Sequence, residues 1–532
     1  MALRIRDLVL KPGESENRLG DRIADEVGCD PDQIKDWSVL RKGLDARKKH
    51  DITFVYTVKF EVENEEKFLY QYSNHPKLDR CVEEPCLTIH KVTRPFHVVV
   101  AGMGPAGLFC ALTLAEAGAR VTLLERGQAV EQRLKDVRRF WNDGILDAHS
   151  NVQFGEGGAG TFSDGKLTTR LKHPGIPHIL ARMVEMGAPV EIRYLAKPHI
   201  GSDRLRKVLI NFRKHLLSLG VDIRFLSMLT GIEMSQGRVA GVTINHSDDL
   251  PCDALVIAPG HSARDTYKML EKIGVKLELK PFAIGVRVEH PLELINRIQY
   301  GRGCSPALPP ADYRLSWNDP DTGRGVYSFC MCPGGMVINA SSEEGGLVVN
   351  GMSNYRRNTS MSNSALVVTV TPADFDHPAM MAGVDFQRRW EKAAWQAGEP
   401  GWRAPAQPLL EFLNGRGGHL LSSCRPAVVH ADLDDCLPAY VANCLRRALP
   451  YFDRKMRGFI AEDATLIGVE TRTSAPLRIL RDLSGESVSH RGLFPAGEGA
   501  GYAGGIMSAA VDGLNAAVQI LRQQSQTLMR SK

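Results

Sequence analysis

The 532-residue sequence is informative first for what it lacks. It has no run of about 18 consecutive apolar residues, the length that a membrane-spanning helix requires, so we expect no membrane partner. The opening residues, MALRIRDLVLKPGESE, do not contain the apolar segment of a signal peptide. Without an export signal, the cysteines are expected to stay reduced, which favours a cytoplasmic location.

Cysteine occurs eleven times, but no two cysteines have the C-x-x-C spacing. Zinc ribbons and a thioredoxin-type dithiol therefore have no support, and no metal site is predicted. Internal repeats and low-complexity tracts are missing as well. The formal net charge of +5 is mild for this length. It is compatible with an anionic substrate and gives no reason to expect nucleic acid as a partner.

The residues that are present describe a multidomain globular protein. Hydrophobic residues make up 43% and charged residues 24% of the chain. One core rarely extends over this length, so two or three domains are expected. Residues 52–62 alternate between apolar and polar side chains, as in a half-buried strand, and residues 19–27 suit a short amphipathic helix. Residues 1–95 are accordingly predicted to form a small α+β domain.

The strongest motif is VVVAGMGPAG at residues 98–107. A short apolar run predicts a buried parallel strand, and three glycines follow it in the G-x-G-x-x-G spacing. In that motif the first glycine permits a tight turn, the second lets backbone N–H groups approach a pyrophosphate, and the third allows close packing of helix and strand. The pyrophosphate would lie at the positive end of the helix that begins here. The residues expected to contact it are Gly102, Gly104, Pro105, Ala106 and Gly107.

An acidic residue follows at the expected place. A second predicted strand, residues 120–124, ends at Glu125, which is followed by Arg126. A carboxylate about 20 residues beyond the glycines accepts hydrogen bonds from an adenosine ribose and would repel a 2′-phosphate, which disfavours NADP at this site. The alternative is a solvent-facing glutamate at a strand end, which would leave the complete β-α-β pattern unexplained. We predict that Glu125 and Arg126 bind the cofactor.

A second glycine-rich segment, GLFPAGEGAGYAGGIMSAAVDG, occupies residues 492–513. A strand is predicted to lead into its acidic residue, and a helix rich in small residues to begin after it. Flavoproteins use such a distal segment to bind the ribityl chain through an acid and to direct a helix N-terminus at the N1–C2=O edge of the flavin. The segment therefore favours FAD over NAD. The residues expected to bind FAD here are Gly497, Glu498, Gly504, Gly505 and Ile506.

A third segment, NVQFGEGGAGTFSDGKL at residues 151–167, is too rich in glycine for any regular element. A loop pressed flat against a planar ligand would use this composition, whereas the alternative is a flexible surface loop. The phenylalanines in the segment favour an ordered loop. We predict that Gly157, Gly158 and Gly160 contact the cofactor.

Together these motifs resemble those of the glutathione-reductase-type flavoproteins, and the loop at 151–167 corresponds in place to the Gly-Gly loop of fumarate reductase. More specifically, the chain resembles a largely uncharacterised bacterial family of FAD-dependent dehydrogenases. The segments that carry this resemblance are LDARKK (44–49), the loop at 151–167, PFAIGVRVEH (281–290), CMCPGG (330–335), GVETRTSAPLRI (468–479) and GEGAGYAGGI (497–506). The resemblance implies a flavin-binding oxidoreductase and no particular substrate.

The predicted fold is α/β. A Rossmann-type FAD-binding domain is built from two discontinuous segments, residues 96–264 and 462–532. It is interrupted by an α+β substrate domain, residues 265–461, and preceded by the small N-terminal α+β domain. Within the first segment, residues 202–260 are expected to return to the same domain, with short strands near 238–244 and 254–258 on either side of a polar turn at 246–249.

Candidate catalytic residues follow from their positions near the last cofactor segment. Arg472 and Glu470 lie just before it, where an arginine could hold a substrate carboxylate or stabilise reduced flavin. An internal Arg–Glu pair at a domain junction is an equally good interpretation. Cys332, with Cys330, could be a redox or nucleophilic group, although cysteines in such a strand more often serve packing. No C-x-x-x-x-C follows Gly107, so a disulfide-reductase mechanism of that type is not supported.

The leading hypothesis is an FAD-dependent dehydrogenase or reductase that moves a hydride through flavin N5 to or from a small anionic molecule. Since there is one dinucleotide motif, NAD(P)H as a reductant would have to bind transiently in the inserted domain. One rival is a tRNA-modifying flavoprotein that uses the basic run at 47–50, and another is a non-catalytic FAD-binding protein. Nothing in the sequence indicates an oligomeric state.

Overall fold

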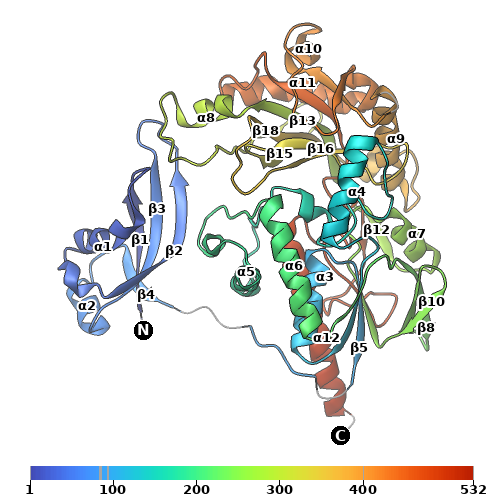
Figure 1. The fold of residues 1–532 in the computed structure, drawn as a ribbon, viewed down its shortest axis with the longest axis horizontal. Helices are drawn as coiled ribbons and strands as arrows, with labels where there is room; N and C mark the ends of the chain where they lie inside the picture. The colour runs from blue at the N-terminus through green and yellow to red at the C-terminus, as the bar shows by residue number, and fades with distance from the viewer. Residues whose placement is uncertain (1, 83–86, 93–94, 399–400, 531–532) are drawn as a thin grey trace.

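Three sheets organise the computed structural model, which describes residues 2–82, 87–92, 95–398 and 401–530 (Figure 1). A four-stranded sheet comes from the start of the chain, a five-stranded sheet from its middle and far end, and a seven-stranded sheet from the segment between. None of the helices in the described residues has the length and apolar character that crossing a membrane requires.

The five-stranded sheet is parallel throughout, with strand order β23-β11-β5-β6-β7. The bounds of its strands are β5 His97–Ala101, β6 Arg120–Leu124, β7 Asp222–Arg224, β11 Ala254–Ile257 and β23 Leu493–Pro495. Val98, Val99 and Val100 are fully buried, as expected for a parallel strand covered on both faces. The sheet thus takes its last strand from the far end of the chain, and the predicted α/β fold with a discontinuous Rossmann-type domain is confirmed.

The helices of this domain also join distant segments. Helix α3 (Pro105–Glu116) packs against α12 (Ile506–Arg530), and a Cβ atom at Gly513 would lie 1.9 Å from the carbonyl oxygen of Ala106. Only a glycine permits this approach of the two main chains. The other helices of the domain are α4 Val130–Asp143, α5 Gly175–Glu185, α6 Ser202–Ser218 and α7 Arg264–Lys272.

Residues 229–251 differ from expectation. They form a separate antiparallel sheet, β10-β9-β8, from β8 (Leu229–Ser235), β9 (Arg238–Ile244) and β10 (Asp248–Pro251). The polar residues expected as a longer turn instead contain a strand. Asn245 and His246 both have positive φ, 50° and 67°. They are the central residues of a turn that the Ser247 N–H closes by donating to the Ile244 carbonyl. Ile244 then pairs with Asp248 across a three-residue loop, so the chain pairs again at once.

The seven-stranded sheet has the order β14-β15-β18-β13-β21-β19-β20. Its strands are β13 Phe282–Pro291, β14 Ser316–Asn318, β15 Gly325–Cys332, β18 Met361–Val370, β19 Ala404–Pro408, β20 Val428–His430 and β21 Thr465–Glu470. Two short ladders adjoin it, β16 (Met336–Asn339) with β17 (Val349–Met352), and β12 (Leu277–Leu279) with β22 (Leu477–Ile479). Its helices are α8 Leu292–Tyr300, α9 Ala382–Ala397, α10 Leu409–Asn414 and α11 Ala439–Lys455.

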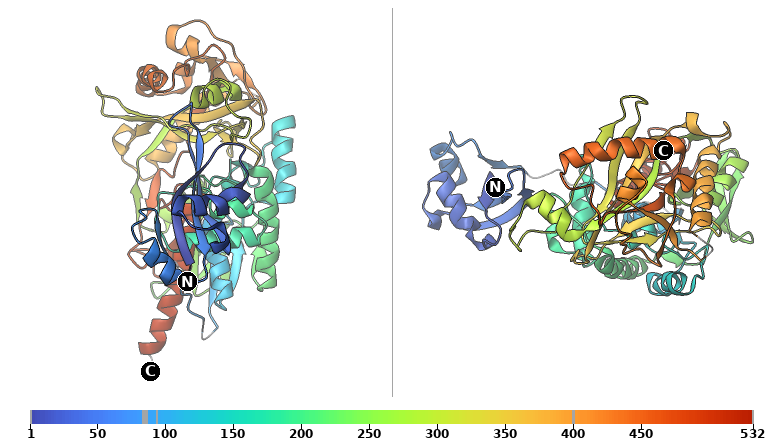
Figure 2. Two further views of the ribbon diagram at one scale, coloured as in Figure 1. Left: turned by 90° about the vertical axis from the view of Figure 1, so that its left-hand side faces the viewer. Right: turned by 90° about the horizontal axis from the view of Figure 1, so that it is seen from above.

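The N-terminal sheet, β2-β3-β1-β4, projects to one side of the molecule (Figure 2). It contains β1 Ala2–Leu10, β2 Asp36–Asp45, β3 Thr53–Glu61 and β4 Leu78–Cys81, with helices α1 Leu19–Val27 and α2 Glu65–Gln71. The edge strand β2 reaches the rest of the chain, because the Lys42 N–H donates to the Tyr194 carbonyl and the Ala196 N–H to the Lys42 carbonyl, both at 2.8 Å. Domain boundaries at 95, 264 and 461 remain a proposal.

The glycine-rich loop 151–167 is ordered by one buried arginine. Arg133 of α4 donates to the carbonyls of Asn151, Val152 and Glu156 at 2.7–2.9 Å and to the Thr161 hydroxyl at 3.1 Å. A Cβ atom at Gly155 would lie 2.4 Å from the Arg133 side chain, so this glycine makes room for it. Part of the loop, Gly158–Phe162, forms a 3₁₀ turn. Burial lowers the pKa of Arg133 to about 10, and the side chain remains charged at neutral pH.

We predict that Arg133→Met destabilises the protein and loosens this loop. The substitution keeps most of the volume but leaves buried carbonyl groups without a donor, which should lower the free energy of unfolding by at least about 3 kcal/mol. Arg139→Met, at an exposed position of the same helix, is the control and should stay within about 0.5 kcal/mol of the wild type. Urea unfolding and hydrogen exchange of residues 151–162 measure both effects. Equal protection of the loop in the two variants would contradict the role of Arg133.

Candidate functional site

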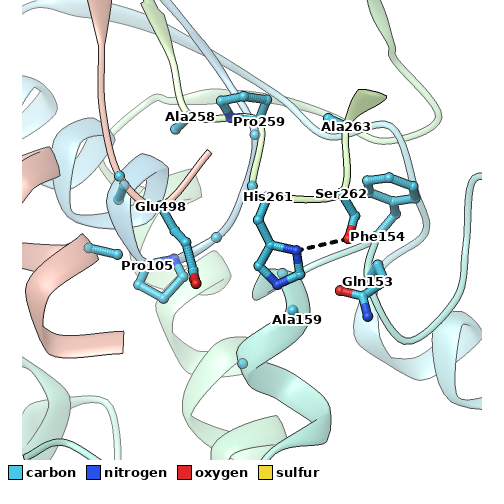
Figure 3. Close-up of a pocket in the computed structure, with 18 of the residues that line it drawn as sticks. Pro105, Gln153, Phe154, Ala159, Ala258, Pro259, His261, Ser262, Ala263 and Glu498 are labelled. Carbon is cyan, nitrogen blue, oxygen red and sulfur yellow. Dashed lines mark hydrogen bonds between the residues drawn. The ribbon is translucent and has the colours of Figure 1, made fainter. Parts of the chain in front are cut away.

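A cavity of about 370 Å³ opens at the carboxyl ends of β5, β6, β11 and β23. This is where ligands bind in open α/β sheets, and the volume lies in the usual range for small-molecule sites. The three glycine-rich segments all contribute to its wall, as do residues 257–263 (Figure 3). Residues of the seven-stranded sheet, Phe329, Cys330 and Glu470, line the same cavity.

The glycines of the first turn serve two different purposes. At Gly102 (φ 107°) a Cβ atom would lie 2.1 Å from the Ala258 carbonyl oxygen, and at Gly107 it would lie 1.8 Å from the Gly102 carbonyl oxygen. These two glycines are required by the fold itself. Gly104 has an ordinary φ of −76°, and the nearest atom to its Cβ position is the Gly158 Cα at 4.0 Å. Neither backbone conformation nor protein packing requires glycine there, so the space it leaves suits a ligand that approaches the main chain.

The same turn presents donors to this space. Gly104 is the N-cap of α3, and the first N–H groups of a helix have no partner within it. These N–H groups lie at the positive end of the helix dipole, where they can donate to an anion such as a pyrophosphate. Pro105 and Ala106 line the cavity beside them. A pyrophosphate group fits the residues present.

Glu125 is buried, and its carboxylate accepts backbone N–H groups from Met103, Gly127 and Gly155 at 2.9–3.0 Å. Two carboxylate oxygens offer about four acceptor positions, so the geometry leaves room for a further hydroxyl donor. Arg126 stacks over the Phe154 ring, 4.4 Å from its centroid, and its guanidinium also pairs with Asp265. Both Glu125 and Arg126 line the cavity.

The C-terminal segment forms a further part of the wall, beside the first turn of α3. Glu498 lines the cavity with Gly497, and burial raises the pKa of its carboxyl to about 7, with Lys280 opposing the shift (Figure 3). Gly504 and Gly505 have no atom within 4 Å of their Cβ positions. They precede Ile506, the first residue of α12, so that a second helix N-terminus faces the cavity.

Of the three loop glycines, two reach the cavity. Gly158 lies against the pyrophosphate turn, with its Cβ position 3.2 Å from the Gly104 Cα, and Gly160 lies against Ile506. Gly157 is directed elsewhere, since its Cβ position is 2.4 Å from Leu209 and it does not line this cavity. Its φ of 84° explains the glycine. Gly157 therefore supports the loop conformation by packing against Leu209 of α6, on the side away from the cavity.

His261 and Ser262 follow β11 at the cavity wall, and the His261 Nδ1 lies 2.9 Å from the Ser262 hydroxyl (Figure 3). Burial, together with the nearby positive charges of Arg472 and Arg264, lowers the pKa of His261 to about 3. The imidazole is therefore neutral at physiological pH. It can exchange hydrogen bonds but cannot supply a proton as an imidazolium.

Two of the three candidate catalytic residues line the cavity, and the third does not. Arg472 and Glu470 line it, but each is held in a buried ion pair, Arg472 with Glu391 at 2.8 Å and Glu470 with Arg287 at 2.8 Å. Cys332 is fully buried, and its neighbour Cys330 is the cysteine that lines the cavity. The side chain that faces the cavity depends on the local strand geometry, which the sequence spacing alone could not reveal.

Lys166 and Asn350 also line the cavity and were not singled out from the sequence. The Lys166 ammonium donates to the Met331 carbonyl, a neutral acceptor, so its positive charge stays available. The motif that contains it, FSDGKL, offered a signal, whereas nothing local marked Asn350. No group of three His, Cys, Asp or Glu side chains suited to a metal occurs among the residues for which the structure gives positions.

Comparison with known families agrees with this geometry. Residues 97–157 match a family described as "FAD binding domain", and residues 281–473 match "FAD-dependent protein, C-terminal domain-like". Residues 2–61 match a domain of unknown function. The first match covers the pyrophosphate turn, Glu125 and the start of the glycine-rich loop. The chain therefore contains an FAD-binding domain.

Several solved structures resemble the chain weakly. CtdE in complex with FAD is 14% identical, with 82% of this chain and 91% of that chain covered and a TM-score of 0.32. The flavin-dependent halogenase CmlS is 11% identical, with 82% and 60% covered and a TM-score of 0.37. These values are too low to support an argument about activity.

A protein from Clostridium beijerinckii, described as "Uncharacterized protein", is 44% identical over 532 residues, which cover 98% of this chain and 99% of the clostridial protein. Identity at this level over nearly the whole of both chains includes the four-, five- and seven-stranded sheets. The chain belongs to the same family as this clostridial protein, a family of FAD-binding-domain proteins.

Proposed function

We propose that the protein is an FAD-dependent oxidoreductase that moves a hydride through flavin N5 to or from a small anionic molecule. The observation that carries this proposal is the composition of the cavity at the carboxyl ends of the parallel strands. Its wall joins the pyrophosphate turn to ionisable side chains of the seven-stranded sheet. FAD, when bound, would supply a two-electron redox centre, and the sheet residues would face the part of the cavity away from the pyrophosphate turn.

The chain's own residues would divide the work of holding the cofactor. The first-turn N–H groups of α3 would bind the pyrophosphate, and Glu125 the adenosine ribose. Glu498 is half-buried, with a raised pKa, and would accept or donate hydrogen bonds to ribityl hydroxyls depending on its protonation state. The N-terminus of α12 would stabilise negative charge that develops on the reduced ring.

Lys166 supports the choice of an anionic substrate. Its ammonium lines the cavity and donates to a neutral carbonyl rather than to a carboxylate. The charge of Arg472 is already balanced by Glu391, which accepts from its Nε and Nη2 at 2.8–2.9 Å. Lys166 is thus better placed than Arg472 to attract an anion, while Arg472 is assigned a positioning role.

That positioning role has a clear structural basis. Besides Glu391, the Arg472 guanidinium donates to the hydroxyls of Ser262 and Ser342 at 3.1 and 2.7 Å. Arg264 donates to the same Glu391 carboxylate at 2.7 and 2.9 Å. Both arginines and Glu391 are nearly inaccessible to solvent. The network fixes the turn after β11, which forms part of the cavity wall.

The two rival functions predict different observations. A tRNA-modifying enzyme would use the basic run at 47–50, but the Arg47 guanidinium already pairs with Asp45 at 2.6 Å. A non-catalytic FAD-binding protein would bind the cofactor without accepting electrons from any small reductant. Anaerobic mixing of the purified protein with NADH and with NADPH, followed by absorbance, separates catalysis from binding and tests the transient reductant.

We predict that the purified protein is yellow and that Gly104→Val removes the colour without unfolding the chain. Because the Gly104 Cβ position is open and its φ is ordinary, valine should fit the protein but occupy cofactor space. FAD affinity should fall at least about tenfold, or ~1.4 kcal/mol. Gly107→Val is the contrasting variant, since its side chain would collide with the Gly102 carbonyl and should prevent folding. Absorbance and fluorescence titration of the apoprotein with FAD measure the affinity.

A colourless wild type that cannot be reconstituted with FAD would refute the proposed function. If Gly104→Val bound FAD as tightly as the wild type, the cofactor would not occupy the space beside the pyrophosphate turn.

We also predict that Arg472→Ala lowers the free energy of unfolding by about 3–5 kcal/mol, because it leaves part of a buried ion network uncompensated. Arg478→Ala, six positions further on, is the control: its side chain is 39% exposed and lies 3.5 Å from Glu278, so its loss should cost less than about 1 kcal/mol. Chemical unfolding measures both. Unchanged stability of Arg472→Ala together with slower flavin reduction would instead favour direct contact between Arg472 and the substrate.

A further inference from the structure

Two cysteines meet at the end of the cavity formed by the seven-stranded sheet. Cys330 is half-buried and lines the cavity, whereas Cys332 is fully buried directly behind it. The Cys332 thiol is directed back at residue 330, since its Sγ lies 3.4 Å from the Cys330 carbonyl oxygen. The C-x-C segment therefore places Cys330 at the cavity wall and holds the Cys332 thiol against it.

The backbone at this point is irregular. The pairing of β15 with β18 shifts register between Phe329 and Cys332, and Cys330 has a φ of 45°. A β-bulge brings residues of one strand closer together than regular pleating does and re-aims a side chain. A non-glycine residue at positive φ costs free energy and persists only where the surroundings enforce it, most often at functional sites.

Two cations from different elements enforce this conformation. The buried Arg287 of β13 donates to the Cys330 carbonyl at 2.9 Å, and Lys166 of the glycine-rich loop donates to the Met331 carbonyl. Gly351 leaves the room that Arg287 needs, because a Cβ atom there would lie 2.5 Å from its Nη1. The bulge is thus held rigidly in one arrangement rather than left to relax.

The charges around the two thiols differ in effect. The Cys332 thiol and the positive charges of Arg287 and Lys166 lower the pKa of Cys330 to about 5, although burial and Asp164 oppose the shift. The pKa of Cys332 is raised by the same contact with Cys330 and by burial. The buried Glu470 also faces the pair, and its own charge is balanced by Arg287. This arrangement favours the thiolate at Cys330 and the protonated thiol at Cys332.

We propose that Cys330 and Cys332 form a redox-active dithiol that exchanges two electrons with the flavin. In the forward direction a sulfur–sulfur bond forms between them, and both sulfurs are oxidised. The electron pair and the proton of Cys332 pass to the oxidised flavin, which becomes the anionic reduced form. Cys330 has already lost its proton, so charge and atoms balance. The reverse reaction reduces the disulfide.

This proposal rests on the proposed function, because it requires bound FAD. It extends that function by naming Cys330 and Cys332 as the groups that exchange electrons with the flavin. A disulfide between residues two apart is constrained, and strained disulfides are the more easily reduced ones, as exchange with a flavin requires.

The decisive measurement is an anaerobic titration of the air-oxidised, FAD-loaded protein with dithionite. Since a disulfide and a flavin each take two electrons, the wild type should take up about four electrons per flavin. Cys330→Ser and Cys332→Ser should remain yellow and take up about two. Cys29→Ser, a half-buried cysteine of the N-terminal unit, is the matched control and should take up about four.

Alkylation with iodoacetamide and peptide mass analysis provide a second readout that needs no variant. In the oxidised wild type, Cys330 and Cys332 should resist alkylation, and after reduction Cys330 should react at pH 7 much faster than Cys29, whose pKa is raised by burial. A yellow wild type that takes up about two electrons, or whose Cys330 is alkylated equally before and after reduction, overturns the dithiol alone. A colourless wild type overturns the proposed function as well.

Discussion

Close approach of main chains around the first turn of α3 is the constraint on which the rest of the site depends. Three glycines allow it: Gly102 against Ala258, Gly107 against Gly102, and Gly513 against Ala106. At each of these glycines two stretches of main chain lie so close together that a side chain would force them apart. With these contacts in place, β11 and α12 lie beside the glycine turn at 102–107, and residues of both line the cavity.

Buried arginine side chains stabilise the parts of the cavity wall that close main-chain contacts at glycine do not hold. Arg133 satisfies the carbonyls of the glycine-rich loop, Arg472 and Arg264 share Glu391 behind the turn at 258–263, and Arg287 holds the bulge at Cys330. These arginines direct most of their donors at backbone or carboxylate groups of the protein itself. Lys166 also donates to a backbone carbonyl, that of Met331, and its charge acts on Cys330 at the cavity wall.

Much of the fold could be predicted from the sequence because the decisive signals are local. The apolar run before Gly102 and the spacing of the glycines predict a strand, a turn and a helix, and the segment around Glu498 predicts the returning strand and α12. The remaining features depend on partners far away in the chain. Arg472 looks the same in sequence whether or not Glu391 faces it, and the choice between Cys330 and Cys332 depends on a bulge set by β18. The extra strand β10 depended on two non-glycine residues with positive φ, which composition does not reveal.

The order of the segments along the chain has a consequence for biosynthesis. The glycine turn is synthesised early, but β23 and α12, which complete the cavity, follow the whole of the seven-stranded sheet. Since domains fold progressively as the ribosome releases them, the parallel sheet must wait with an open edge beside β11 until residues 493–495 emerge. A cofactor held by both the glycine turn and the segment after β23 could therefore bind only after that segment has emerged.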